Sequence, residues 1–255
     1  SDEDIIFRSQ YAPMIIAELT EKQIKKVAKS EEVCEINFYE ELQWKTHLSL
    51  SELKESTGVD IIYDIGLTGA GVKVGVHDDY YFYDKYGEFT PSDRFHVLFD
   101  DKDTSKEHSI LVTRVLCGDN GVAPEAECYL ICSNEAYGND HYQRFETLIS
   151  NGVSLINYSK GSDRGNDFYH DEEKWIDHIS TVHNVSFVVS AGNEAGKICI
   201  PAMAFNAITV GGFDNNSTTL TSDDTIYNSS NYNNGDSRYY IIVSTIFFKL
   251  KIFTK

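Results

Sequence analysis

The segment that most constrains the fold of this chain runs from Ser186 to Gly196, where an apolar stretch breaks into small residues around one asparagine. Phe187, Val188 and Val189 favour a strand and show no alternation of polar and apolar residues, which is typical of a strand buried on both faces of a parallel sheet. Ligands of such sheets bind just beyond the carboxyl ends of the strands. We therefore expect a binding site directly after this strand.

The small residues that follow the strand have the chemistry of an oxyanion hole. Ala191 and Gly192 have almost no side chain, so a ligand can lie against their backbone, and the carboxamide of Asn193 offers an N–H donor beside that space. An asparagine among small residues is also a common turn residue. A plain turn is therefore the alternative interpretation of this loop.

Two other segments carry candidate catalytic side chains. A predicted strand, Val72–Val76, is followed by Asp78 and Asp79, and either carboxylate is a candidate partner for a histidine. His108 opens a predicted helix and stands shortly before a Gly-Val-Ala-Pro segment that begins at Gly121. An isolated histidine is more often structural, and a general base is the functional alternative.

Together these segments resemble the subtilase family of serine peptidases. The matching segments, in the order in which the family has them, are Gly69–Asp78, His108 with Gly121–Pro124, and Val188–Gly196. The resemblance implies that Asp78 holds the tautomer of a catalytic histidine, that His108 is this general base and acid, and that Asn193 binds the oxyanion. It favours Asp78 over Asp79 because the family's strand motif, in this register, ends on Asp78.

The resemblance also implies a substrate site. Its expected residues are a segment that pairs with the substrate as an added strand, Ser159, Lys160 and Gly161, and a wall beside the first substrate side chain, Ser190, Ala191 and Gly192. Lys160 replaces a leucine of the family, so we expect a cation beside the bound peptide. The implied partner is a peptide or protein substrate.

One part of the family pattern is missing. The family places its nucleophile in a Gly-Thr-Ser-Met/Phe-Ala-Ala-Pro segment, and the nearest match here, Gly235-Asp-Ser237, is followed by bulky residues that favour a strand. We therefore expect that Ser237 is not the nucleophile, and we interpret the basic ending as a premature or out-of-frame terminus. The chain is then an endopeptidase by family, and the alternatives are a catalytically inactive pseudoprotease that binds peptide or protein and a non-functional truncation.

The predicted fold class is α/β, a parallel doubly wound sheet of subtilisin type with a small α/β propeptide-like module at the N-terminus. Strand-like segments alternate with helix-like ones, which is typical of parallel βαβ units. The predicted divisions are 1–45 as a partial propeptide-like module, 46–237 as an incomplete catalytic domain and 238–255 as a divergent basic tail. In the first division Thr20 and Gln23 predict a capping box, and an ordinary β-α-β edge module is the alternative interpretation.

Local patterns give further expectations. On the helix predicted over 171–184, His178 and His183 are expected to be exposed to solvent. Residues 33–38 predict a strand, and residues 214–237, which are rich in Asn, Ser, Thr and Asp, predict a loop. The five cysteines are scattered without metal-ligand spacing, and we interpret them as small buried hydrophobes.

Composition limits the partners and cofactors. The formal charge of −18 argues against nucleic acid or an anionic membrane surface as a partner. We expect no metal and no cofactor; the family allows structural calcium, but the sequence assigns no site for it. This chain shows no signal peptide, and the resemblance implies a secreted or extracellular protein.

Overall fold

The computed structural model of the protein describes residues 5–17, 19–30, 32–34, 36, 59–79, 87, 89–100, 108–133, 141–162, 169–214, 225–232 and 242–244, and the statements below concern these. They are organised around a seven-stranded sheet with the strand order β11-β8-β7-β6-β3-β5-β4, in which every pair is parallel. The strands are β3 (Lys73–Asp78), β4 (Phe95–Asp100), β5 (Glu127–Cys132), β6 (Leu155–Tyr158), β7 (Ser186–Ser190), β8 (Ala207–Gly211) and β11 (Ile242–Ser244). The predicted α/β class with a parallel sheet is confirmed.

The order of the strands places a switch point at β3. The chain first adds β4 and β5 on one side of β3 and then β6, β7 and β8 on the other side. In open parallel sheets a crevice forms beyond the carboxyl ends of the strands where the direction of winding reverses. The carboxyl end of β3 is therefore where the topology favours a binding site.

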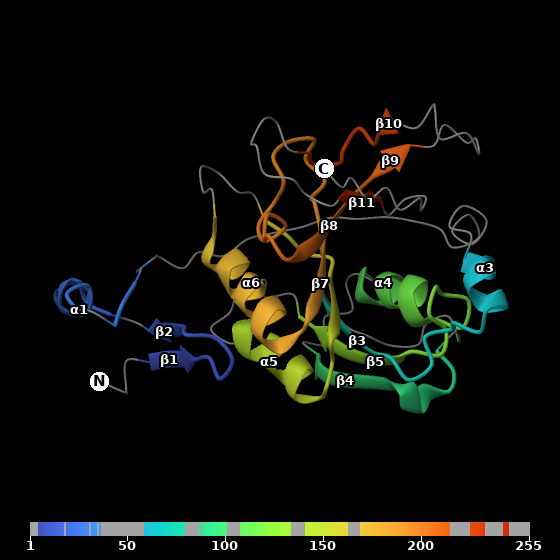
Figure 1. The fold of residues 1–255 in the computed structure, drawn as a ribbon, viewed down its shortest axis with the longest axis horizontal. Coiled ribbons are helices and arrows are strands. Elements are labelled where there is room, and N and C mark those ends of the chain that lie inside the picture. Colours follow the sequence, from blue (N-terminus) through green and yellow to red (C-terminus); the bar gives the residue numbers. More distant parts are fainter. Residues whose placement is uncertain are drawn as a thin grey trace.

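Helices cover both faces of the sheet, as Figure 1 shows, and the alternation of residues along the strands explains why. Val74 and Val76 of β3 lie in one core with Ile110 of α4 (His108–Cys117). The other core joins strand residues such as Phe187 to side chains of α5 (His141–Ser150) and α6 (Asp171–His183). Successive side chains of a strand point to opposite faces. Even-numbered residues of β3 therefore face α4, and odd-numbered ones face α5 and α6.

The N-terminal residues form a hairpin and a short helix. β1 (Ile5–Arg8) pairs antiparallel with β2 (Ile15–Ala17), and α1 (Glu21–Val27) follows. The predicted capping box is confirmed, because the Thr20 side chain accepts from the Gln23 backbone and the Gln23 side chain accepts from the Thr20 backbone. The strand expected over 33–38 is not seen at Val33, Cys34 or Ile36, the residues of that segment that the structure describes.

The turn of this hairpin contacts α5 and α6, next to which it lies in Figure 1. The ring Nε2 atoms of His178 and His183 each lie 3.0 Å from the carbonyl oxygen of Tyr11, to which they donate. The backbone N–H of Gln10 donates to the Glu146 carboxylate at 3.1 Å. The expectation that His178 and His183 are merely solvated was therefore wrong. These two histidines of α6 instead bind the turn of the hairpin, which lies more than 160 positions away in the chain.

Several short elements complete the described fold. α3 (Val59–Asp64) precedes β3, and a 3₁₀ turn, Ser92–Arg94, precedes β4. The segment expected to be loop begins with a small antiparallel ladder between β9 (Phe213–Asp214) and β10 (Thr225–Ile226). Within the basic ending, β11 pairs in parallel with β8 at the edge of the main sheet. β4 and β11 are the two edge strands; the sequence pattern did not predict β4, whereas β11 lies in the bulky run after Ser237 that favours a strand.

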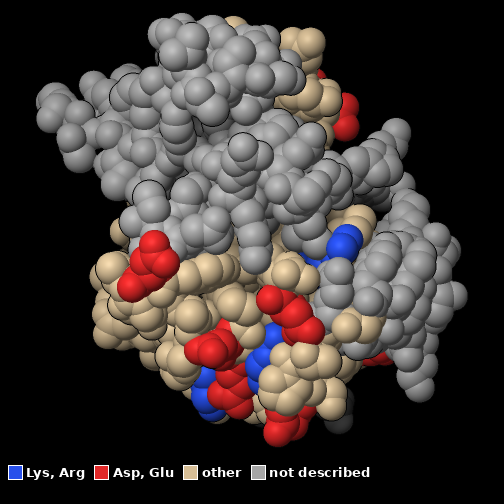
Figure 2. All heavy atoms as spheres, turned by 90° about the vertical axis from the view of Figure 1, so that its right-hand side faces the viewer, with Lys and Arg blue, Asp and Glu red and all other residues tan. Residues whose placement is uncertain are grey.

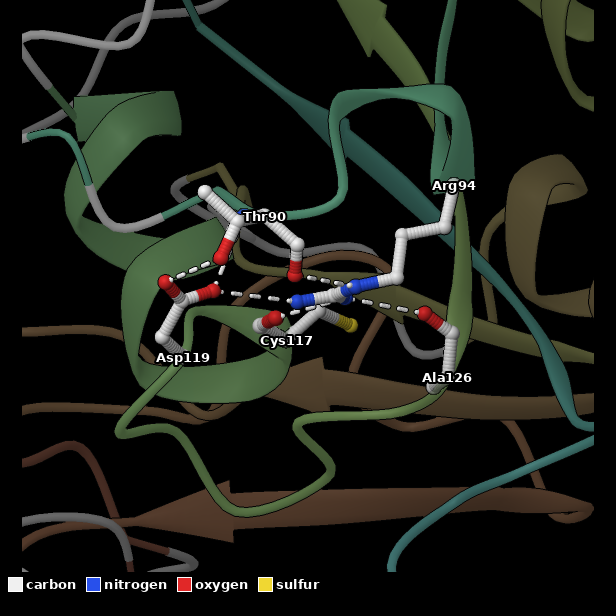
Figure 3. A network of polar contacts seen from close by, with 5 residues as sticks. All are labelled: Thr90, Arg94, Cys117, Asp119 and Ala126. Carbon is white, nitrogen blue, oxygen red and sulfur yellow. Dashed lines mark hydrogen bonds and ion pairs between the residues drawn. The ribbon is translucent and has the colours of Figure 1, made fainter.

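A network of polar contacts fixes the carboxyl end of α4 (Figure 3). The Arg94 guanidinium donates to the carbonyl oxygens of Thr90 at 3.0 Å, Cys117 at 2.8 Å and Ala126 at 3.1 Å, and to the Asp119 carboxylate at 3.4 Å. Asp119 also accepts from the Thr90 backbone at 2.9 Å and from its hydroxyl at 2.6 Å. We call these five residues the Arg94 clamp. It ties the last turn of α4 to the starts of β4 and β5.

The surface and the cysteines agree only in part with the sequence expectations. Figure 2 shows acidic and basic side chains next to one another on the described part of one face. All five cysteines are free; four of them are buried, but Cys34 is exposed, so its interpretation as a buried residue was wrong.

Among the described residues there is no cluster of three or more potential metal ligands. Nor does any described helix have the length and apolarity needed to cross a bilayer.

Candidate active site

Asp78 stands at the carboxyl end of β3 and is fully buried. Its even number places the side chain on the α4 face of the sheet, where α4 begins with His108. The Asp78 Oδ1 atom accepts a hydrogen bond from Nδ1 of His108 and another from the backbone N–H of Asp79 at 2.6 Å. The structure thus brings together the two side chains that the spacing of the sequence motifs pairs.

The hydrogen bond to Asp78 determines the tautomer of His108. A carboxylate only accepts, so Nδ1 carries a proton, and in the neutral ring Nε2 then has a lone pair available as a base. The His108 side chain keeps 16% of its surface exposed, whereas that of Asp78 has none. The base is therefore accessible to a reactant while its orienting carboxylate is screened from water.

The charges around His108 favour its protonated form. Burial disfavours an imidazolium here, but the attraction and hydrogen bond of Asp78, together with the charge of Asp79, outweigh burial and raise the pKa of His108 above its ordinary value. This is the direction expected for a base whose cationic form must be stabilised during a reaction. On the opposite face of β3, burial lowers the pKa of His77 well below its ordinary value, so that ring is neutral.

Asp79 and Lys160 lie beside the Asp78–His108 pair and contact each other. The Lys160 ammonium is 2.6 Å from Asp79 Oδ1, and it donates to the backbone carbonyl of Ser133 at 2.9 Å. The Lys160 side chain is completely buried. The expectation that Lys160 puts a cation beside a bound peptide differs from this arrangement, because its charge faces the interior.

The loop after β7 is anchored in the sheet and leaves Asn193 exposed. Ala191 is buried and its backbone N–H donates to the carbonyl of Val210 on β8 at 2.7 Å. Gly192 has a φ of 104°, a conformation that residues with a side chain rarely adopt. Asn193, which follows, is exposed. Its carboxamide is thus carried by a loop whose first residue is anchored in the sheet.

A second asparagine, Asn231, which the motifs did not indicate, holds this loop in place through hydrogen bonds. Its side-chain oxygen accepts from the backbone N–H groups of Glu194 at 2.7 Å and Gly196 at 3.1 Å, and its backbone N–H donates to the Gly192 carbonyl at 2.9 Å. A Cβ on Gly192 would lie 2.3 Å from the Asn231 amide nitrogen, so the contact also explains why position 192 must be glycine.

The expected substrate segment lies between the two halves of the site. Ser159, Lys160 and Gly161 follow β6, which pairs with β3 on one side and with β7 on the other. Ser162, the next residue, forms an antiparallel bridge with Ile200. Neighbouring strands are about 4.8 Å apart, so the ends of β3 and β7 are separated by about 10 Å at the edge of the sheet. All the described candidate residues therefore gather at one edge of the sheet.

One site expectation lies outside the described residues: Ser237, the nearest match to a nucleophile. Of the site residues expected from the sequence, Asp78 and His108 are in direct contact. Ser190 and Gly192 are partly buried, and Ala191 and Gly161 are buried.

Comparisons with known proteins bear on the family and the fold. The family model described as the subtilase family matches residues 44–243, which extends past the last of the motifs and ends within β11. The epidermin leader peptide processing serine protease EpiP from Staphylococcus aureus superposes with a TM-score of 0.62 at 16% identity, over 89% of this chain and 66% of that one. The prenylagaramide maturation protease PagA gives 0.56 at 18% identity, over 73% and 67%.

A lanthipeptide protease gives a TM-score of 0.51 at 17% identity, over 71% of this chain and 60% of that one. At such identities these structures bear on the fold alone. The chain spans about two thirds of the length of each of the first two. A comparison with curated protein sequences gives no match.

Proposed function

The chain belongs to the subtilase family of serine peptidases, and from this premise we propose that it supplies the base and the oxyanion donor of a serine endopeptidase. The observation that carries the proposal is the hydrogen bond from His108 Nδ1 to the buried carboxylate of Asp78, which leaves Nε2 as the base. The substrate is a peptide or protein. For the location of the protein we propose secretion or the extracellular space, on the family alone.

The proposed reaction moves one proton through His108. As a serine hydroxyl attacks the carbonyl carbon of the substrate, Nε2 takes the hydroxyl proton and the carbonyl oxygen becomes an oxyanion. Asp78 stabilises the resulting imidazolium through the Nδ1–H bond. His108 then gives the proton to the departing amine, which breaks the peptide bond, and water releases the acyl group by the same steps in reverse order.

Asn193 is the proposed donor to the oxyanion. Its loop is anchored by Asn231 and by the β8 contact of Ala191, so the carboxamide needs little reorganisation when the negative charge forms. In subtilisin, removal of such a donor lowers kcat by about 10²- to 10³-fold. We expect Asn193→Ala to reduce any hydrolysis by this chain to a similar degree.

A second candidate function is peptide binding without cleavage. The observation that favours it is that the segments after β6 and β7, which are neighbouring parallel strands, lie at the same edge of the sheet. The residues proposed to receive the substrate, Ser159–Gly161 and Ser190–Gly192, do not depend on the nucleophile. A peptide can add to them as a strand whether or not a serine is present to attack it.

One experiment distinguishes the two candidates. The wild type, His108→Ala and a control, His96→Ala on the edge strand β4, are incubated with a fluorophosphonate probe, which labels activated serines, and assayed for peptide cleavage and peptide binding. Labelling and cleavage that are lost only in His108→Ala support hydrolysis. Peptide binding with no labelling of any variant supports the binding function, and the absence of labelling, cleavage and binding would contradict both.

A further inference from the structure

Two consecutive carboxylates, Asp78 and Asp79, end β3 beside a single catalytic histidine. Both are buried, with 0% and 4% of their surface exposed. An imidazolium attracts any nearby carboxylate, and both of these act on His108 through their charge. A site that needs one fixed tautomer and one ring orientation therefore needs a means of choosing between them.

The side chains of Asp78 and Asp79 point in different directions. Asp78 Oδ1 accepts from His108 Nδ1, on the face of the sheet that α4 covers. Asp79 instead lies 2.6 Å from the Lys160 ammonium, which comes from the segment after β6. The alternation of side chains along β3 sends neighbouring residues to opposite faces, and the contacts follow this rule one position beyond the strand.

Lys160 is held in place independently of Asp79. Its ammonium donates to the carbonyl of Ser133 at 2.9 Å, and the backbone N–H of Ser133 donates to the carbonyl of Asp78 at 2.8 Å. One buried cation thus joins the carboxyl ends of β6, β3 and β5. Asp79 Oδ1 has no hydrogen bond of good angle among the described groups, so the attraction to Lys160 is mainly one of charge.

We propose that Lys160 is a positioning residue, which binds Asp79 and so leaves Asp78 as the one carboxylate that orients His108. The proposal rests on the proposed function, since it concerns the same base. It accounts at once for the second carboxylate, Asp79, and for Lys160 in place of the family's leucine, because the two side chains form one ion pair. Both side chains are buried.

The charges nearby set the expected response to mutation. The titratable and charged groups around the ion pair are Asp78, His108, His77, His141, Arg144 and Glu172. Asp79 raises the pKa of His108 and Lys160 lowers it. Removing the carboxylate alone should therefore lower the midpoint of the His108 titration, and removing the ammonium alone should raise it, because Asp79 then turns to the imidazolium.

The test is an NMR titration of His108 in protein labelled with ¹⁵N-histidine, with His108→Ala to assign its signal. We expect Asp79→Asn to lower the midpoint and Lys160→Met to raise it, each by on the order of one pH unit, the size of the effect of one neighbouring charge. The double variant Asp79→Asn/Lys160→Met should return the midpoint close to that of the wild type. Lys160→Arg keeps the charge and should leave the midpoint unchanged.

None of these results requires a measurement of proteolysis. The proposal for Lys160 can therefore fail while the proposed function stands, and the proposed function can fail while the proposal for Lys160 stands. Midpoints that stay at the wild-type value in both single variants, or that move in the same direction in both, would overturn it. If a single variant does not fold, recovery of folding in the double variant supports the pairing. A double variant that folds no better than the singles would contradict it.

Discussion

The two ends of α4 carry two different kinds of polar network. At the carboxyl end, the Arg94 clamp gives its guanidinium three backbone carbonyls and one carboxylate, and every one of these contacts joins pieces of the fold (Figure 3). At the amino end, His108 contacts one buried carboxylate, Asp78, and a second, Asp79, lies nearby with a buried lysine. There Asp78 Oδ2 and Asp79 Oδ1 have no hydrogen-bond partner among the described residues.

This difference separates stability from function within one helix. Asp119 of the Arg94 clamp keeps 31% of its side chain exposed, so water shares in the solvation of its charge. The charged groups at the amino end are buried away from water, so each strongly affects the others, and leaving one of them unpaired lowers the stability of the fold. We infer that the carboxyl end of α4 holds the helix in place, whereas the amino end keeps a base ready to take a proton.

The largest effect should come from breaking the buried ion pair. Lys160→Met takes the ammonium away from the buried Asp79 carboxylate and leaves only the more distant His108 ring to offset its charge, and we expect the free energy of unfolding to fall by about 3–5 kcal/mol. Urea unfolding measures this. The control is Lys174→Met, which removes a half-exposed pair with Asp171 and should cost less than about 1 kcal/mol. Similar losses in the two variants would erase the distinction between buried and exposed charges on which the comparison depends.

A smaller loss should follow from opening the Arg94 clamp. Arg94→Met leaves the carbonyls of Cys117 and Ala126 without this donor, and we expect a loss of about 1–3 kcal/mol in the same unfolding experiment. Arg94→Lys should recover only part of it, since an ammonium cannot reproduce the planar fork of a guanidinium. The His108 titration should not change in either variant. A shifted titration would show that the two ends of α4 are coupled.

The smallest effect concerns pH, and its sign differs between the two ends. The raised pKa of His108 stabilises the fold below the ordinary histidine value of 6.5, and this contribution is lost as pH rises through the folded-state pKa. For Asp119, burial acts against the charge, but hydrogen bonds from Thr90 and the charge and hydrogen bond of Arg94 together outweigh it and lower the pKa. Its contribution is present above the ordinary value of 3.8 and is lost as pH falls through the lowered pKa.

Unfolding measured across pH separates these contributions. In His108→Ala the free energy of unfolding should fall less steeply as pH rises, and in Asp119→Asn it should fall less steeply as pH drops. If either variant changed the opposite limb of the pH profile, the assignment of the pH dependence to these two groups would be wrong.

Local sequence patterns were sufficient where local physics decides the structure. The apolar runs of β3, β5 and β7 predicted buried parallel strands, and the residues that follow them placed Asp78 and the Asn193 loop at the sheet edge. The pairing of Asp78 with His108 also followed from the order of motifs. Parity along β3 could further have separated Asp78 from Asp79, because it assigns them to opposite faces.

Features that depend on distant contacts were missed. Lys160 was expected at the substrate because it replaces a leucine in the segment that the resemblance assigns to the substrate, and only the position of Asp79, 81 residues earlier, explains its burial. Asn231 looked like one of many polar loop residues until its contacts with Glu194 and Gly196 were known. The edge strand β4 has a mixed pattern, so only its neighbour in the sheet defines it.

The central claim is that Asp78 holds His108 as a base, and the titration of the His108 ring in the wild type and in Asp78→Asn tests it most directly. The asparagine keeps the shape of the side chain but removes the charge that contributes most to offsetting burial. We predict that the wild-type midpoint lies above the ordinary histidine value of 6.5 and that the Asp78→Asn midpoint falls below it. Equal midpoints in the two proteins would contradict the account.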